Sequence, residues 1–577
     1  MEKKNKLIIL GVIILLLVAS GLTFAILTWN STMIKLGINT NCFTIDYTKG
    51  NDIGGSLKLI NEEDLISNGK FTIKEGVGVS AVNIGINSNC SIEGYGNIIL
   101  NITNISSAFT TGSSKGALKY AVLKNTSTIT TPSSISTTSL LNQSFDIEKK
   151  GSIDTSGTLK LLTKQLSNTE LYKYIIVIYV DNNLAGNDVT SATFQGNISA
   201  DATQGRINAD ITLNYLNKFN NTIKLANDTP DFTTVSGNNG VKMKHDSFKF
   251  SQTATGVGDG TKGIYKAEDD FGTSYYFRGA VENNYVKFAN FYWRIIRING
   301  DGSIRMIYAG TSAHANGESE TDSFIDETAY NTNYQDNGYV GYMYGNFTTP
   351  TNCNTDNNTG VTTCTGGSTS YEEAHANIND STIKTYIDNW YNDNLKDYAY
   401  ALEDTIYCND RSITPVDNFA GVTLTGIGKG IENTAYSGFT RSYINHTPSL
   451  KCVNKNDRFT VNNSIGNTKL TNPIALITSD EVYMAGAFTY NYIDDFLIKN
   501  TDFYLYNGNL YWTMTPFGTF RKYSRVEEVS LFLSGGYQIV QGVSSNGYNR
   551  GVRPVVSLSS DAISGGNGTI SNPFTVG

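Results

Sequence analysis

"FYWRIIRINGDGSIRMIYAG", residues 291–310, places three arginines among large apolar side chains on either side of an Asn-Gly-Asp-Gly tetrad. The tetrad favours a tight turn at Gly300-Asp301, so we predict two antiparallel strands that continue from it. Because side chains alternate between the two faces of a strand, one face of this hairpin then carries Trp293, Ile295, Ile304, Met306 and Tyr308. An apolar face of that kind indicates a core hairpin rather than a cationic binding site.

The positions of the arginines favour one register of this hairpin. With a two-residue turn, Arg297 faces Ile304 and Ile296 faces Arg305. Sliding the strands so that Ile298 pairs with Ile304 would set Arg297 directly against Arg305, and like charges in that position are destabilising. We therefore predict the first register.

The composition of the 577-residue chain favours a multidomain protein rich in strands and turns. A single core stops growing near ~250–300 residues, so two to four domains are expected. The 35 tyrosines and 55 glycines, against 9 prolines, are typical of strands and turns. The net charge of −8, with no basic run beyond the N-terminus, argues against a nucleic-acid partner.

An apolar run over residues 7–29 follows three lysines among the first six residues. It is long enough for a membrane-spanning helix, which needs ~20 residues, and the lysines should stay in the cytoplasm. Small residues at Thr23-Phe24-Ala25 or Val18-Ala19-Ser20 also fit a cleavage site. We therefore predict export, with residues 1–29 as a signal peptide or a membrane anchor. The rest of the chain lies at the cell surface, or is secreted after cleavage.

Six cysteines, an even number in an exported chain, indicate disulfides. Two lie before residue 100 and four after residue 350. The expected bridges are Cys42–Cys90, Cys353–Cys364 and Cys408–Cys452, and free thiols are the alternative. No CxxC spacing occurs and the four histidines are scattered, which argues against a zinc site.

The chain after the leader divides into three regions. Residues 30–205 read as short alternating runs between turns, which is typical of a β-sandwich. Within them, Leu171–Val180 is apolar on both faces and fits a central strand. Residues 206–250 are polar and read as a linker around one short helical piece, and residues 251–577 form the second folded region.

The second region is predicted to be α+β. Apolar residues recur at helical spacing from Ile383 to Leu395, with Asp380 placed to cap the helix. Thr478 and Glu481 have the spacing of a capping box, which marks a second helix. Pro554 in the apolar run near the C-terminus predicts an edge or bulged strand.

The first third of the chain resembles the camelysin/TasA-type proteins of Gram-positive bacteria. The likeness rests on GLTFA (21–25), YKYIIVIYVD (172–181) and FQGNISA (194–200). Those proteins are exported β-sandwich subunits of extracellular fibres. The resemblance implies self-association through the β-sandwich, with the segment after Ala25 donated as a strand to a neighbour. The metalloprotease activity credited to some members is not carried over, because no HExxH-like pair occurs here.

Residues 260–577 resemble a recurrent, largely uncharacterised domain of Firmicutes surface proteins. The likeness rests on FYWRIIRINGDGSIRMIY, CNDRS (408–412), ITSDEVYMAG (477–486), YWTMTP (511–516), GVRPVVSL (551–558) and GGNGTISNPFTV (565–576). A Trp-containing strand, a Gly-rich hairpin and a closing Gly-x-Arg strand also look like the C-type-lectin-like fold shared with formylglycine-generating enzymes. The paired catalytic cysteines of those enzymes have no counterpart here, so the resemblance implies the fold without oxidase chemistry.

Four residues of this region are candidates for ligand binding. Tyr504 and Tyr506 are placed at a loop tip, where binding residues concentrate. Trp512 offers a stacking platform for a sugar ring, although an aromatic in the middle of a strand usually belongs to the core. Arg553 could reach a ligand carboxylate or a sugar hydroxyl, and the structural alternative is a bond to Asp561 or to a loop carbonyl.

No catalytic motif emerges, so no enzymatic activity is expected. Ser-His-Asp, Cys-His and P-loop spacings are missing from the sequence. Calcium has a faint signal at Asp301, Asp269-Asp270 and Asp494-Asp495, but these acids do not supply the ligand run of an EF-hand loop. Turns and solvated faces explain them, and no cofactor is expected.

The sequence thus predicts an exported Gram-positive surface protein of mainly β structure with some α. Its order is a membrane helix, a β-sandwich and an α+β C-type-lectin-like domain that binds glycan or protein ligands. Two alternatives remain. One is a subunit of an extracellular matrix fibre. The other is a secreted hydrolase, which would need a pair of close carboxylates that a sequence does not reveal.

Overall fold

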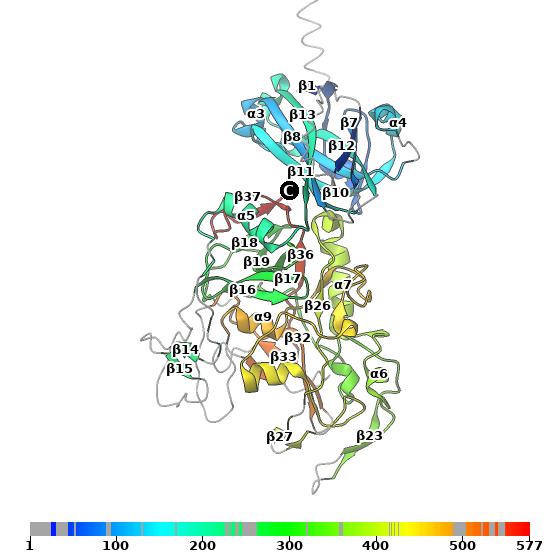
Figure 1. The fold of residues 1–577 in the computed structure, drawn as a ribbon, viewed down its shortest axis with the longest axis vertical. Helices are drawn as coiled ribbons and strands as arrows, with labels where there is room; N and C mark the ends of the chain where they lie inside the picture. The colour runs from blue at the N-terminus through cyan, green and yellow to red at the C-terminus, as the bar shows by residue number, and fades with distance from the viewer. Residues whose placement is uncertain are drawn as a thin grey trace, which may run out of the picture. The chain divides into compact units, whose positions relative to one another are not determined.

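The computed structural model describes most of the chain after the leader. The described residues are 25–29, 44–50, 54–87, 94–127, 131–167, 170–223, 225–226, 230, 232, 234–236, 242–244, 262–318, 321–356, 362–414, 416, 418–419, 422–424, 426–487, 503–520, 523–529, 537–539 and 549–577. Contacts divide the chain into a first unit of Met1–Ile207 with Lys396–Ala401 and Gly577, and a second of Asn208–Leu395 with Leu402–Val576 (Figure 1). Most elements are strands, so the prediction of a mainly β protein is confirmed.

The predicted membrane segment, residues 7–29, lies outside the described residues up to position 24. Its last five residues form strand β1 (Ala25–Trp29), so the prediction of a helix that reaches Trp29 is wrong at this end. The physical reason is the pairing of β1 with β13 (Thr193–Gln204) on one side and β3 (Gly54–Leu57) on the other, which satisfies its backbone. In the part of the chain that the structure describes, no helix is long and apolar enough to cross a membrane.

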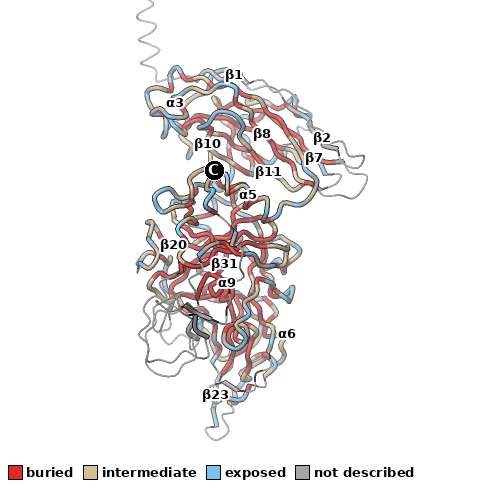
Figure 2. Tube along the Cα trace, turned by 60° about the vertical axis from the view of Figure 1, so that its left-hand side comes forward, coloured by how far each residue is buried: buried red, intermediate tan, exposed pale blue. Residues whose placement is uncertain are grey.

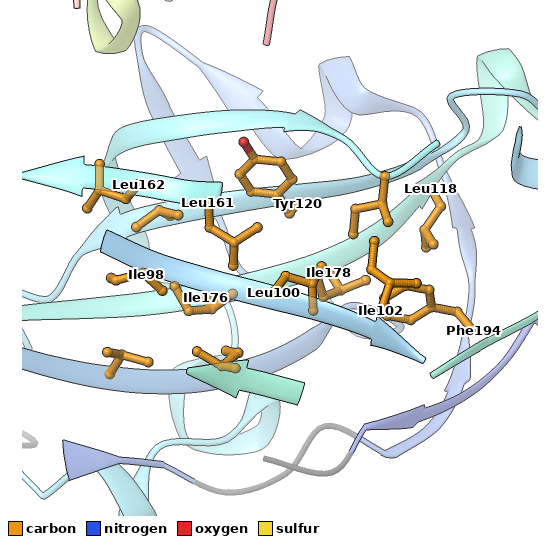
Figure 3. Packing of buried hydrophobic residues seen from close by; sticks show 14 of the residues in the cluster. Ile98, Leu100, Ile102, Leu118, Tyr120, Leu161, Leu162, Ile176, Ile178 and Phe194 are labelled. Carbon is orange, nitrogen blue, oxygen red and sulfur yellow. The ribbon is translucent and has the colours of Figure 1, made fainter. Parts of the chain in front are cut away.

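Two sheets form the first unit. One has the order β11-β8-β13-β1-β3, and the other has the order β2-β7-β12-β9-β10-β6-β5, with β4 beside β12. Their other strands are β2 (Thr44–Lys49), β4 (Leu59–Ile60), β5 (Ile66–Ser67), β6 (Lys70–Thr72), β7 (Gly78–Asn87), β8 (Gly94–Ile105), β9 (Leu118–Lys124), β10 (Ser144–Ser152), β11 (Gly157–Leu166) and β12 (Leu171–Asp181). Side chains of both sheets meet in one buried cluster, which includes Leu100 of β8 and Ile176 of β12 (Figure 3).

Strand β12 is buried on both faces, as its sequence predicts. It lies between β7 and β9. Its Ile176 and Ile178 belong to the cluster shared with the other sheet, whereas Ile175 and Val177 belong to a second cluster. Because successive residues of a strand point to opposite faces, this one strand contributes to two cores.

Two large sheets, several two-stranded ones and several helices form the described part of the second unit. One sheet has the order β31-β36-β20-β19-β18-β38-β37, with β17 beside β19 and β16 beside β17; the other has the order β21-β35-β32-β33-β34, with β29 beside β32. The strands are β16 (Gly263–Asp269), β17 (Gly272–Arg278), β18 (Tyr285–Phe288), β19 (Phe291–Ile298), β20 (Ile304–Gly310), β21 (Glu327–Thr328), β29 (Thr434–Ala435), β31 (Ile474–Ala475), β32 (Tyr511–Phe520), β33 (Tyr523–Val529), β34 (Tyr537–Ile539), β35 (Arg550–Gly551), β36 (Val555–Leu558), β37 (Ile563–Gly565) and β38 (Phe574–Val576). Figure 2 shows α9 (Ser479–Met484) and β31 among the buried segments.

The helices begin where local capping places them. Helix α7 (Thr382–Asn394) is capped by Ser381, whose hydroxyl accepts from the backbone of Lys384, and not by Asp380. Helix α9 opens with the predicted capping box between Thr478 and Glu481, which is confirmed.

Helix α5 (Ala209–Phe219) lies within residues 206–250, the predicted linker. It belongs to the second unit, where the Tyr215 hydroxyl donates to the carbonyl of Ile563 at 2.6 Å. The helical piece expected there is thus part of a folded unit.

Pro554 precedes a strand that is central and not an edge. Strand β36 starts at the next residue and lies between β20 and β31. The carbonyl of Pro554 accepts from the Tyr308 amide at 2.9 Å. A proline just before the first residue of a strand leaves the ladder intact, so the predicted edge or bulge is not required.

The predicted hairpin forms, but half of its register differs. Strands β19 and β20 pair with Ile295 opposite Met306, as expected, and then shift by one residue. Ile298 therefore pairs with Ile304, and the turn is one residue longer, with Gly302 in the left-handed region at φ 87°. A three-residue loop ending in a left-handed glycine is a common hairpin connection.

Two of the three predicted disulfides are confirmed. Cys353 bonds Cys364 between the short strands β23 (Thr351–Thr355) and β24 (Thr362–Thr365). Cys408 bonds Cys452 across 44 residues of sequence. Cys42 and Cys90 lie outside the described residues.

Candidate functional site

Glu481 connects helix α9 to the hairpin. Its Oε1 lies 2.9 Å from Arg297 Nε and 2.6 Å from Arg305 Nε. Asp269 contacts Arg297 Nη1 at 2.7 Å, and all four side chains are buried. Burial alone would raise the pKa of Glu481, but the charges of Arg305 and Arg297 outweigh it and hold that pKa below its ordinary value. Glu481 is therefore an ionised structural anchor.

A second ionic group adjoins the first. Arg441 contacts both carboxylate oxygens of Asp480 at 2.8 Å, and Asp410 at 2.7 Å. Arg458 pairs with Asp270 at 3.1 Å. Apart from Arg458, these groups and the ones around Glu481 line a hollow of ≈ 520 Å³. Because most of the charges that line it pair with charged neighbours, we interpret this hollow as part of the framework and not as a ligand site.

The CNDRS segment (408–412) leads from this network to the surface. Arg411 pairs with Asp457 at 2.7 Å, and both side chains are buried. The carbonyl of Arg411 accepts from the Tyr371 hydroxyl at 3.0 Å. Ser412, the next residue, reaches an open depression. The buried pair thus fixes the backbone that carries both Ser412 and the Tyr371 contact.

This depression, which we name the groove, has a volume of ≈ 990 Å³. Its lining includes Tyr371, Ser412, Ile413, Ile427, Lys429 and Asn454. Ile413 and Ile427 are 38% and 56% exposed, so they add apolar contact area to the lining. Asn454 Nδ2 donates to Ser412 Oγ at 3.0 Å beside them. Apolar contact area next to a few polar groups is the general character of a binding site.

The carboxylates of the groove bear on the hydrolase alternative. Among the described residues that line it, Glu372 is the single carboxylate. Glycoside hydrolysis by the usual mechanism needs two carboxyl groups on either side of the scissile bond. The described lining of the groove supplies one of these two groups.

The structure buries all four residues that the sequence singles out. Trp512 is fully buried, with its Nε1 donating to the carbonyl of Thr328 at 2.8 Å, so the core alternative holds for it. Tyr504 and Tyr506 are 3% and 7% exposed, so the expectation of a surface loop tip is wrong. The amide of Tyr504 donates to the carbonyl of Gly279, which holds this turn against the body of the second unit.

Arg553 has a structural role, as the alternative interpretation predicts. It donates hydrogen bonds to backbone carbonyls, and not to Asp561. Its Nε donates to Tyr308 O and its Nη1 to Leu505 O, both at 3.0 Å. Arg553, Tyr504 and Tyr506 together line a third, smaller hollow of ≈ 280 Å³, which we name the Arg553 hollow. Three of the four candidates thus come together, while Trp512 does not join them.

Sequence reasoning missed the groove residues and the target of Glu481. The capping box at Thr478 marked the position of Glu481. A local pattern does not show the arginines that Glu481 binds, of which Arg297 lies 184 residues away. Apart from Ser412 of CNDRS, the groove carries no motif, since its lining comes from separate segments around residues 371, 412, 427 and 454. Exposed isoleucine in a polar loop was the available signal.

The described residues contain no cluster of three or more His, Cys, Asp or Glu side chains arranged to hold a metal ion. The acidic pair Asp269-Asp270 is engaged by Arg297 and Arg458. The other acidic pair, Asp494-Asp495, lies outside the described residues.

Comparisons with known proteins identify no relative. No protein-family model, no curated protein and no solved structure matches the chain.

Proposed function

We propose that the chain is an exported bacterial surface protein whose second unit binds glycan or protein ligands in the groove. The groove carries this proposal, because it combines exposed isoleucines, a tyrosine and hydroxyl and amide groups in one open depression. The two disulfides are consistent with an oxidising extracellular location. The Gram-positive origin rests on the sequence resemblances.

A C-type-lectin-like arrangement of the second unit is part of the same proposal. The motifs behind that resemblance fall on strands: YWTMTP opens β32, and GVRPVVSL supplies β35 and β36. The hairpin β19–β20 pairs with β36, which agrees with a fold whose C-terminal strand returns to the first part of the domain.

The binding test uses the full chain on a glycan array and on immobilised extracellular proteins. Ile427→Asp and Asn454→Ala alter the groove, and Ile378→Asp is the matched control, because Ile378 is 58% exposed but does not line the groove. We expect the groove variants to lose about tenfold in affinity for the captured ligand and the control to lose none. No binding on either platform, or an equal loss in the control, would contradict the proposal.

A fibre subunit is the second candidate, and strand β1 is the observation that favours it. This strand follows the leader directly and contributes its backbone between β13 and β3. A terminal strand that completes a sheet in its own chain can complete the same sheet in a neighbour. Electron microscopy of protein lacking residues 1–24 should then show filaments, and removal of residues 25–29 as well should abolish them. Filaments that persist without residues 25–29 would exclude this route.

A further inference from the structure

Arg553 is a buried cation that has no acidic partner among the described residues. It is 2% exposed and donates to two neutral carbonyls, and the ring of Tyr511 lies 4.7 Å from its Cζ. None of the ion pairs of the described residues includes it. A buried charge that neutral groups alone compensate is costly, so this position needs a counter-charge.

Three other buried arginines of the second unit, Arg297, Arg305 and Arg411, meet that need with a carboxylate oxygen within 2.7 Å. The partly buried Arg441 does the same, whereas the buried Arg278 donates to the carbonyls of Tyr483 and Met484. Asp322, an acid whose charge raises the pKa of Tyr308 near Arg553, is held by Thr311, Ser312 and His314 instead. Arg553 differs from Arg297, Arg305 and Arg411, because no carboxylate of the described residues contacts it.

The Arg553 hollow contains a second unusual group. Tyr504 lines it, and the hydroxyl of Tyr504 is buried with no hydrogen-bond partner in the part of the chain that the structure describes. Such a group loses about 1–3 kcal/mol relative to a bonded hydroxyl. Burial raises the pKa of Tyr504, so the hydroxyl keeps its proton and remains a donor.

Two more features make the hollow suitable for negative charge. The guanidinium of Arg294 also lines it, with its Cζ 5.3 Å from the ring of Tyr504 and 3.7 Å from the ring of Tyr285. Ser312 and Asn507 add a hydroxyl and an amide to the lining. The free space at its centre takes about one water-sized group, so it excludes a bulky or extended ligand.

We propose that the Arg553 hollow binds a single anion of halide size, chloride in the extracellular medium, between the Arg553 guanidinium and the Tyr504 hydroxyl. The anion supplies the missing counter-charge of Arg553 and accepts the unused hydrogen bond of Tyr504. This site is separate from the groove and does not depend on the function proposed for it.

Thermal unfolding of the full chain tests the proposal. Sodium chloride is titrated against sodium gluconate at constant ionic strength, so that only the anion changes. Because a ligand that binds the folded state stabilises it, Tm should rise saturably by about 2–4 °C. A Tm that is the same in both salts, or one that rises without saturation, would overturn the site.

Two variants distinguish anion binding by the Tyr504 hydroxyl from a purely structural role of that hydroxyl. In Tyr504→Phe, the chloride concentration that gives half of the rise in Tm should increase about tenfold, because one hydrogen-bond donor to the anion is lost. Tyr330→Phe is the control, because Tyr330 also has a buried hydroxyl without a partner but does not line the hollow, and it should respond like the unmodified chain. A Tyr504→Phe chain with an unchanged chloride response would contradict the proposal.

Bromide gives the position of the anion directly. Crystals of the full chain grown in sodium bromide should show an anomalous peak in contact with Arg553 and Tyr504. Acetate in the unfolding titration tests a carboxylate in its place. A bromide peak only elsewhere, or acetate that stabilises as well as chloride, would overturn the halide assignment.

Discussion

Arg297 lies directly opposite Arg305 across the β19–β20 pair, and the two guanidinium groups contact the same carboxylate oxygen of Glu481. Like charges at such a position repel, and the sequence alone argued against it. The extra residue in β19 makes the arrangement possible, because the register shifts between Ile295 and Arg297. A buried carboxylate between the arginines converts the repulsion into a three-membered ionic group.

Substitution Glu481→Gln should destabilise the second unit by about 3–5 kcal/mol, because two buried arginines lose a shared counter-charge. Urea unfolding followed by tryptophan fluorescence measures the change, since Trp293 lies on β19. Glu282→Gln is the control: its side chain is 76% exposed, and its pair with Lys262 should contribute under about 1 kcal/mol. A loss below about 1 kcal/mol in Glu481→Gln would show that the register does not depend on this carboxylate.

Glu62 of the first unit should give the chain an acid-sensitive stability. Burial alone would raise the pKa of Glu62, but the charges of Lys150 and Lys119 lower it from 4.5 to about 2. The Tyr179 hydroxyl adds a hydrogen bond of 2.6 Å. A carboxyl with a lower pKa in the folded state stabilises the fold above its unfolded pKa, and this contribution, up to about 3 kcal/mol, is lost as pH falls from about 5 to 2.

Circular dichroism melts of Glu62→Gln at several pH values check this expectation. The variant should be less stable at pH 7 and should lose less stability between pH 5 and 2 than the unmodified chain. Glu75→Gln, with a side chain 80% exposed, should retain the original pH dependence. Parallel pH curves for Glu62→Gln and the unmodified chain would refute the role of Glu62.

The two disulfides should differ in their reduction and in their effect on stability. Cys452 is fully buried, whereas Cys353 and Cys364 lie on a partly exposed hairpin, so alkylation during a dithiothreitol titration should label the hairpin pair first. In the chain-entropy model, loss of the Cys408–Cys452 bridge costs about 4 kcal/mol and loss of the shorter one about 3 kcal/mol. Simultaneous labelling of both pairs would mean that burial does not protect Cys452.

Gly302 should be sensitive to any β-carbon, because its φ of 87° lies in the left-handed region. Gly302→Ala should cost about 1–2 kcal/mol, and Gly302→Asn less, since asparagine tolerates this region better. Chemical unfolding of both variants gives the comparison. Equal stability of the alanine variant and the unmodified chain would show that the turn relaxes to a different conformation.

Local patterns carried much of the architecture. The two-sided apolar run of β12 predicted a strand with cores on both faces, because a period of two is a property of the strand itself. The capping box of α9 predicted its first turn for the same reason, since Thr478 and Glu481 satisfy each other's backbone within four residues. Two of the cysteine pairings also followed the order of the residues in the chain.

By itself, the sequence determined that this chain is rich in strands, where β12 and α9 begin, and which cysteines of the second unit pair. Only the tertiary structure decided the register of the hairpin at Arg297, the burial of Tyr504 and Tyr506, and the lining of the groove. The reason is distance along the chain: Glu481 and the loops around the groove reach their partners from tens to hundreds of residues away, and electrostatic compensation of that kind leaves no periodic trace in the sequence.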